Sequence, residues 1–171
     1  LVTSVADGSA TITATSGSVS ATATVTVSQA VASIALAPTS LSFTSIGDTA
    51  SFVATVKDSD GNTIPAAVVA WTTSSSSVAT VSSAGLVTSV ADGTATITAA
   101  FGSVSGTAGI SVAQTATSVT LAPTSLSFSS FGDTASFVAT VKDTGGNTLS
   151  GATVTWTTSS PSVATVSSAG L

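Results

Sequence analysis

Apolar and polar residues alternate along most of this chain, and short turns separate the alternating stretches. In residues 51–57, the side chains of Phe52, Ala54 and Val56 fall on one face, and residues 94–99 repeat the pattern. A period of two is typical of a strand with one buried and one solvated face. No segment combines a helical period with strong helix formers. The pattern therefore predicts an all-β protein.

Turn signals divide the chain at short intervals. Gly supplies positive φ angles, and Asp and Asn side chains bond back to the turn backbone. Such residues occur at 47–48, 58–62, 84–85, 92–93 and 101–103. Seven or eight short strands are predicted between them, near 33–37, 40–44, 49–57, 67–73, 77–81, 86–89, 94–100 and 104–112. Many short strands at this spacing indicate a β-sandwich.

The sequence repeats itself at an offset of 85 residues. Residues 31–86 agree with residues 116–171 at 42 of 56 positions, and residues 1–30 agree with residues 86–115 at 21 of 30. A complete repeat is therefore predicted at 31–115. Residues 1–30 are predicted to be the C-terminal third of one repeat, and residues 116–171 the N-terminal two thirds of another.

Two interpretations remain open for a chain that begins and ends within a repeat. The chain is a window cut from a longer tandem array, or successive copies complete each other by donating strands. Eighty-five residues suffice for one small sandwich.

A small core is predicted around Trp71, the largest apolar side chain of the complete repeat. The residues expected to pack against it are Phe52, Val56, Val78, Val81 and Ile97. In the next copy, Phe137 and Trp156 are expected to take the corresponding places.

Four short motifs carry a family resemblance. They are Val69-x-Trp71 with Ser74, Val-Ala-Thr-Val at 78–81, Gly-Leu-Val-Thr at 85–88 and Gly-Thr-Ala-Thr-Ile-Thr at 93–98. Together they resemble the bacterial immunoglobulin-like group 2 (BIG2) domain. The resemblance implies tandem Ig-like β-sandwiches, found in bacterial surface proteins and adhesins and on phage structural proteins. The family fixes no catalytic residues.

The composition excludes several classes of function. Only 5% of residues are charged, and His and Cys are absent, so the usual zinc, haem and iron–sulfur sites have no ligands. The two lysines, Lys57 and Lys142, cannot form the basic surface that nucleic acid requires. No apolar run approaches the ~20 residues that span a bilayer. We predict no enzyme and no catalytic, metal-binding or cofactor-binding residue, and expect neither a nucleic-acid partner nor membrane insertion of this segment.

The acidic residues lie in or beside glycine-containing turns, where they are expected to support turn geometry. Asp58-Ser59-Asp60-Gly61-Asn62 resembles the start of a calcium loop, but Gly145 replaces Asp60 in the next copy. A calcium ion between repeats, held by Asp48 or Asp92 with carbonyls, is a second alternative. A hairpin turn explains both copies of the loop without a metal.

Three functions are considered for such a module. The first is a non-catalytic, adhesin-like spacer in a stalk or fibre outside a bacterial cell, because the joins at residues 28–31 and 113–116 are short and contain neither Gly nor Pro. The second is a filament whose copies exchange strands. The third is an adhesin or phage-virion module that binds a glycan or host protein through exposed Phe101 and Phe131. The expected partners are neighbouring identical repeats, with a surface glycan or protein under the third hypothesis.

Overall fold

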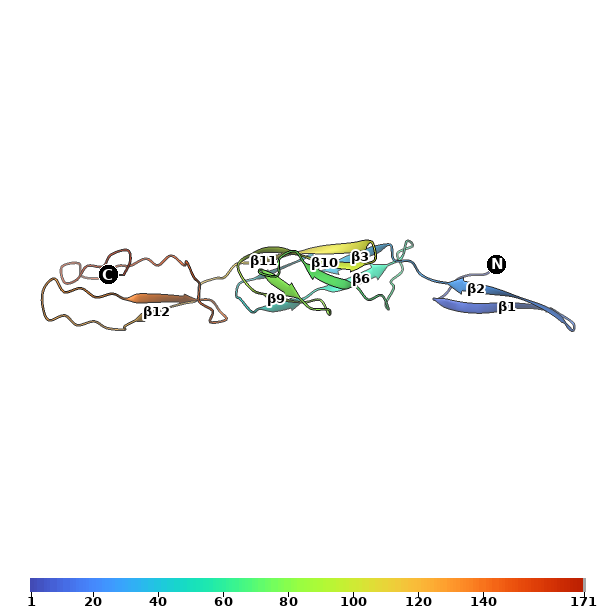
Figure 1. Cartoon of the computed structure of the whole chain (residues 1–171), viewed down its shortest axis with the longest axis horizontal. Helices are drawn as coiled ribbons and strands as arrows, with labels where there is room; N and C mark the ends of the chain where they lie inside the picture. The colour runs from blue at the N-terminus through green and yellow to red at the C-terminus, as the bar shows by residue number, and fades with distance from the viewer. Residues whose placement is uncertain (171) are drawn as a thin grey trace.

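The computed structural model describes residues 1–170, and every regular element in that range is a strand. Figure 1 shows three parts in a row: a hairpin made by β1 and β2 at one end, a sandwich made by β3 to β11 in the middle, and a C-terminal segment that contains β12 and β13 at the other end. We call these the N-terminal hairpin, the central sandwich and the C-terminal segment. The chain is therefore elongated.

The N-terminal hairpin and the last hairpin of the sandwich are built alike. Strands β1 (Gly8–Ser16) and β2 (Val19–Val27) pair from Gly8 opposite Val27 to Ser16 opposite Val19. Strands β10 (Gly93–Phe101) and β11 (Val104–Val112) pair in the same register, displaced by 85 residues. The sequence similarity thus extends to the hydrogen-bond register.

The central sandwich contains three sheets. A four-stranded sheet has the order β4-β11-β10-β7, a three-stranded sheet the order β5-β9-β8, and β3 pairs with β6. All pairs are antiparallel except β4 with β11. The remaining bounds are β3 Ser33–Ala37, β4 Ser40–Phe43, β5 Thr49–Ser51, β6 Val53–Lys57, β7 Ala70–Thr73, β8 Ala79–Val81 and β9 Leu86–Ser89. This all-β, Ig-like sandwich confirms the predicted fold class.

One predicted strand is two strands in the structure. The expected strand at 49–57 divides at Phe52: β5 pairs with β9, whereas β6 pairs with β3. The Phe52 N–H donates to Gly85 O at 2.9 Å. A Cβ on Gly85 would lie 2.6 Å from Phe52 O and 2.9 Å from Trp71 Cζ2, so only glycine fits there. The alternation of apolar and polar residues continues through Phe52, where the chain passes from one sheet to another. The sequence pattern therefore could not reveal the change of sheet. The strands expected at 67–73 and 77–81 are also shorter than predicted.

The core centres on Phe52 and Ile97, which are 2% and 0% exposed. Val56 is buried beside them. The expected centre, Trp71, is only half-buried, as are Val78 and Val81, and all three pack against the buried cluster. The indole thus lies at the margin of the core rather than at its middle. Small residues fill much of the interior, since Ala79, Ala95, Ala99 and Ala108 are buried in it.

The C-terminal segment has fewer strands than its sequence similarity to the sandwich predicts. Within its described residues, 116–170, only β12 (Ser118–Ala122) and β13 (Val138–Lys142) form, as an antiparallel pair. In the sandwich, β4 and β7 hydrogen-bond to the β10–β11 hairpin, and the described part of the C-terminal segment contains no corresponding hairpin. Phe137 and Trp156 stack there with ring centroids 6.4 Å apart.

We predict that Phe52→Ala lowers the free energy of unfolding by about 3–5 kcal/mol, because it empties the most enclosed aromatic position. Trp71→Ala should cost less, since part of the indole is already in water. Urea unfolding of the full chain, followed by circular dichroism, measures both. Val53→Ala is the matched control: its side chain is 63% exposed, and the change should stay within about 0.5 kcal/mol. An equal loss for Phe52→Ala and Val53→Ala would contradict this description of the core.

Candidate functional site at the two joints

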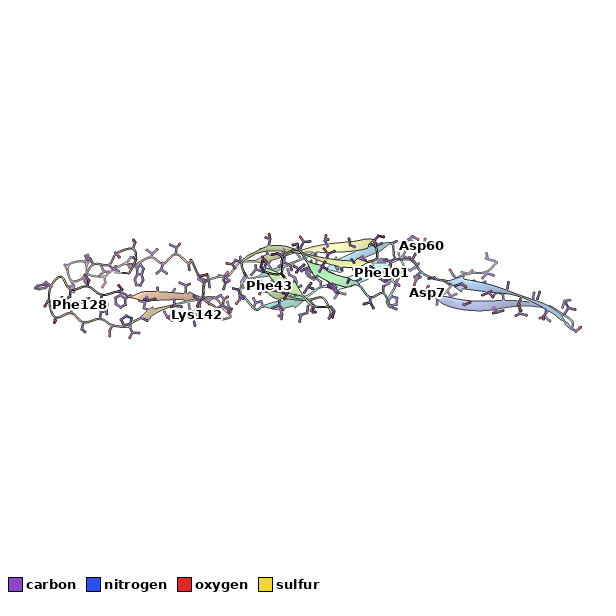
Figure 2. All side chains as sticks on the ribbon, in the orientation of Figure 1. Asp7, Phe43, Asp60, Phe101, Phe128 and Lys142 are labelled. Carbon is purple, nitrogen blue, oxygen red and sulfur yellow. The ribbon has the colours of Figure 1, made fainter. Side chains whose placement is uncertain are left out.

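The central sandwich meets its neighbours at two joints. We call its contact with the N-terminal hairpin the first joint and its contact with the C-terminal segment the second joint. Figure 2 places Asp7 and Asp60 near the first joint, and Phe43 and Lys142 on the two sides of the second. Side-chain hydrogen bonds join neighbouring parts of the chain at both joints.

The backbone is held almost continuously across the second joint. The N–H groups of Ala113 and Thr115 donate, at 3.0 Å each, to carbonyls of the sandwich at Phe43 and Thr44. Two residues after Thr115, the N–H of Thr117 donates at 2.8 Å to a carbonyl at the end of β13. Few backbone torsions are therefore left free between the sandwich and the C-terminal segment.

A glutamine bridges the two sides of this joint. The backbone N–H of Gln114 donates to Asp92 Oδ1, in the sandwich, at 2.7 Å. Its side-chain Nε2 donates to Asp143 Oδ2, in the C-terminal segment, at 2.9 Å. Hydrogen bonds to ionised acceptors are stronger than those between neutral groups. One residue thus ties a carboxylate of each part to the connecting chain.

The same bridge recurs at the first joint. The N–H of Gln29 donates to Asp7 Oδ1 at 2.7 Å, and its Nε2 donates to Asp58 Oδ2 at 2.9 Å. Each partner lies 85 positions before its counterpart at the second joint. We call this arrangement of two aspartates around one glutamine the glutamine bridge. Its repetition shows that both joints are built on one plan.

The second joint has an additional contact that uses the turn after β4. The Ile46 N–H donates to Asp143 Oδ2 at 3.2 Å, and Asn147 Nδ2 donates to Ile46 O at 2.8 Å. Ser45 Oγ accepts the N–H of Gly145 at 3.0 Å. Ser45 is 1% exposed. This turn therefore seats directly on the loop at residues 143–147.

The Asp143 carboxylate is the most enclosed charged group at either joint, with 3% of the residue exposed. Burial opposes its ionisation, but donors outweigh that effect: Gln114, Ser45 and the backbone of Asn147 and Ile46 hold the pKa of Asp143 well below its ordinary value. Because the pKa is lowered, the contribution of this carboxylate is present at neutral pH and is lost only as pH falls through the lowered value. At the first joint the bond from Gln29 likewise lowers the pKa of Asp58.

The loop at 58–62, which resembled the start of a calcium site, and its counterpart at 143–147 use their first aspartate as a turn acceptor. Asp58 Oδ1 accepts the N–H groups of Asp60 and Asn62, at 3.0 and 2.8 Å. In residues 1–170, no three His, Cys, Asp or Glu residues lie close enough together to hold a metal ion. None of the elements described there is a helix long and apolar enough to cross a membrane.

The two candidate recognition residues lie at different places. Phe101 ends β10, beside the hairpin turn, and is 42% exposed. Phe131 is fully exposed in the C-terminal segment, 85 residues after Ile46. Ile46 belongs to the turn that seats on the loop of the second joint, so Phe131 occupies the position corresponding to a joint residue. The structure does not bring Phe101 and Phe131 into one site.

Sequence reasoning missed the glutamine bridge. Gln29 and Gln114 keep the same phase although the residues on either side of them differ between the copies. Each also follows its aspartate by 22 residues, from Asp7 and from Asp92. This pairing was visible in the sequence, but a glutamine in a short connection carries no recognised chemistry.

Solved structures provide partial matches. The chain is 24% identical to the S-layer protein SbsC over 85% of its own length and 21% of that protein, with a TM-score of 0.48. It is 28% identical to domains 4 and 5 of SbsC, over 63% of this chain and 66% of that structure, with a TM-score of 0.47. It is 20% identical to the adhesin InvE of Yersinia pseudotuberculosis, over 52% of this chain and 28% of that structure, with a TM-score of 0.35.

The chain spans about a fifth of the length of the first of these S-layer structures. A search of curated proteins gives no significant match. A family model matches residues 30–112, which contain the whole central sandwich, and it is described as the bacterial Ig-like domain (group 2). The central sandwich therefore matches the bacterial Ig-like domain family of group 2.

Proposed function

We propose that this chain is a non-catalytic spacer in a stalk or fibre outside a bacterial cell, which holds a distal part away from the surface. The observation that carries the proposal is the glutamine bridge, which recurs at both joints with the same distances. The match of the central sandwich to the bacterial Ig-like domain family supports an extracellular structural or adhesive setting. Under this proposal residues 1–30, 31–115 and 116–171 are parts of three successive repeats.

A spacer works by resisting bending at its joints. At each joint, the connecting glutamine has both its backbone N–H and its side-chain amide engaged by carboxylates that belong to different parts of the chain. Bending the joint would break at least one of these bonds and leave an ionised carboxylate partly desolvated. Domains joined by such short, bonded connections form a nearly one-dimensional array, in which each contacts only its neighbours.

Small-angle scattering of the full chain tests the spacer function. We expect an elongated particle whose maximum dimension does not change with protein concentration. A compact particle would contradict the proposed function, because folding back requires both joints to open.

Gln114→Glu tests whether the bridge sets this shape. The new carboxylate would face Asp143, and two like charges at hydrogen-bond distance repel. We expect a less extended average shape at pH 7. At lower pH, where the new glutamate is protonated and can donate to the Asp143 carboxylate, the extended shape should return. Equal scattering from the wild type and the variant at pH 7 would show that the bridge does not hold the joint.

A second candidate function, assembly of copies by strand exchange, is supported by exposed apolar residues. Ile12 in the N-terminal hairpin is 45% exposed, whereas its counterpart Ile97 is fully buried. In the C-terminal segment, Phe128 is 49% exposed, whereas its counterpart Phe43 is 6% exposed. The hairpin thus carries the residues that fill a sandwich core, and the segment carries the surfaces that they would cover.

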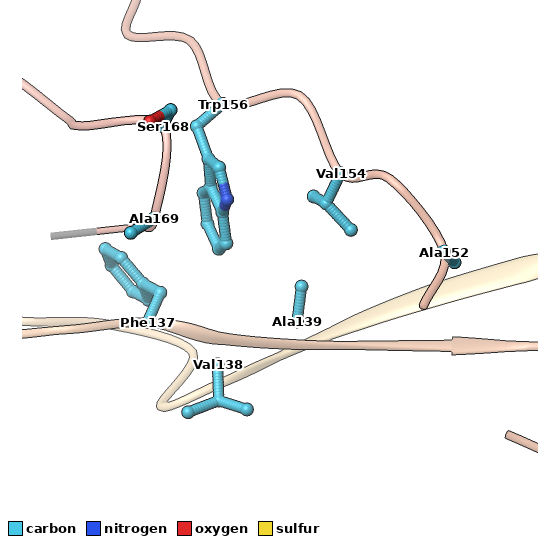
Figure 3. Close-up of a pocket in the computed structure, with 8 residues that line it drawn as sticks. All are labelled: Phe137, Val138, Ala139, Ala152, Val154, Trp156, Ser168 and Ala169. Carbon is cyan, nitrogen blue, oxygen red and sulfur yellow. The ribbon is translucent and has the colours of Figure 1, made fainter. Parts of the chain in front are cut away.

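The C-terminal segment also has a pocket where a hairpin would fit. The pocket has a volume of about 380 Å³. Figure 3 shows Phe137, Ala139, Val154 and Trp156 among the side chains that line it. In the sandwich, the corresponding Phe52 lies in the same core cluster as the buried Ile97 of β10. We infer that β1 and β2 of a second copy fill this pocket with Ile12. In a longer chain, a following repeat would fill it instead.

Sedimentation of the full chain over a range of concentrations tests strand exchange. Under strand exchange, association would grow with concentration and would be abolished by Ile12→Asp, because the charge would enter the core. Thr11→Asp is the matched control on the opposite face, since the counterpart Thr96 is exposed in the sandwich, and it should leave association unchanged. A monomer at every concentration would exclude strand exchange and leave the spacer function standing.

A further inference from the structure

The loops at residues 58–62 and 143–147, which receive the connecting glutamines, have nearly the same backbone. In both, the first residue and the fifth bond across the loop, from Asp58 N to Asn62 O at 3.0 Å and from Asp143 N to Asn147 O at 2.9 Å. The fourth residue is a glycine with a φ of 85° in one loop and 79° in the other. The two loops therefore present nearly the same backbone conformation to the part of the chain that precedes them.

They differ in what the third residue does. In the first loop the N–H of Asp60 turns inward and donates to Asp58 Oδ1 at 3.0 Å. In the second loop the N–H of Gly145 donates across the joint, to Ser45 Oγ at 3.0 Å. A donor that one loop satisfies internally is thus used by the other to bind its neighbour.

The absence of a side chain at residue 145 makes this contact geometrically feasible. A Cβ there would overlap Ser45 Oγ and would lie 2.9 Å from Asn147 Nδ2. Ser45 has little room to withdraw, because it is 1% exposed and its carbonyl accepts Ser89 Oγ at 2.8 Å. An aspartate at 145 would also bring another carboxylate beside that of Asp143, and like charges at close range repel.

We propose that the third residue of this loop selects which preceding domain the loop accepts. Glycine admits a domain whose turn presents a buried serine hydroxyl and a backbone N–H, as Ser45 and Ile46 do, and the joint is then locked by the turn as well as by the glutamine bridge. Aspartate, as at residue 60, would place a side chain where that turn seats and exclude it, so that the glutamine bridge alone would hold such a joint. The partner is thus an Ig-like domain of this same kind, distinguished by its turn.

This inference rests on the proposed spacer function in one respect: alternation of locked and bridged joints would set where along a stalk it bends. The contact itself has an independent readout. The Ile46 N–H is bonded only across the second joint, to Asp143 Oδ2, so its rate of exchange with solvent measures whether the turn is seated.

The test is hydrogen exchange by NMR on the full chain and three variants. In the wild type, the Ile46 amide should be protected. Gly145→Ala should speed its exchange at least about tenfold, because the added Cβ meets Ser45 Oγ. Ser45→Ala combined with Gly145→Ala removes the overlapping oxygen, and protection should return to within about threefold of the wild type. Asp60→Ala, at the same place in the other loop, should leave Ile46 unchanged.

Unchanged protection in Gly145→Ala would overturn the proposal, as would a double variant that exchanges as fast as the single one. Amides of β10 in the same spectra show that the sandwich stays folded. Failure of the spacer function is seen separately, as a compact particle in scattering. A compact chain with a protected Ile46 amide would support the proposed domain selection and contradict the spacer function.

Discussion

The structure depends on how an ionised aspartate is accommodated between the central sandwich and the C-terminal segment. Asp143 is almost entirely enclosed, and a buried carboxylate is tolerated only when donors replace the water it loses. The donors come from three places: the connecting residue Gln114, the turn at Ile46 and the loop's own Asn147. Moving either part away from the other would remove donors from this charge. The requirement to satisfy one carboxylate thus fixes the connection, the turn and the loop together.

This solution suits the composition of the chain. With 5% charged residues and two lysines in 171 positions, ion pairs are too few to hold the joints. Amide and hydroxyl donors take their place, and no side-chain nitrogen or oxygen buried within residues 1–170 lacks a hydrogen-bond partner. Neutral donors around a carboxylate are also less sensitive to pH than a pair of opposite charges, because only one group titrates.

The sequence predicts the fold better than it predicts the joints. The period of two, the turn residues and the repeat lead to an all-strand sandwich with Phe52 and Ile97 in one core cluster. The change of sheet at Phe52 could not be predicted, because apolar and polar residues go on alternating there while the hydrogen-bonded partner strand changes. The half-buried position of Trp71 could not be predicted either, because the size of a side chain does not determine where in a core it lies. The role of Ser45 depends on a loop 100 residues away, and only the structure brings the two together.

The most direct test of the account is a distance measurement across the second joint. The chain has no cysteine, so Val53→Cys and Val138→Cys introduce unique spin-label sites. Both residues are 63% exposed, one in the sandwich and one in the C-terminal segment. Pulsed electron paramagnetic resonance should give one narrow distribution of distances between the two labels. The distribution should broaden when Gln114→Ala removes the side-chain hydrogen bond of the bridge. A distribution that is already broad in the labelled chain, and unchanged by Gln114→Ala, would show that the glutamine bridge does not orient neighbouring domains.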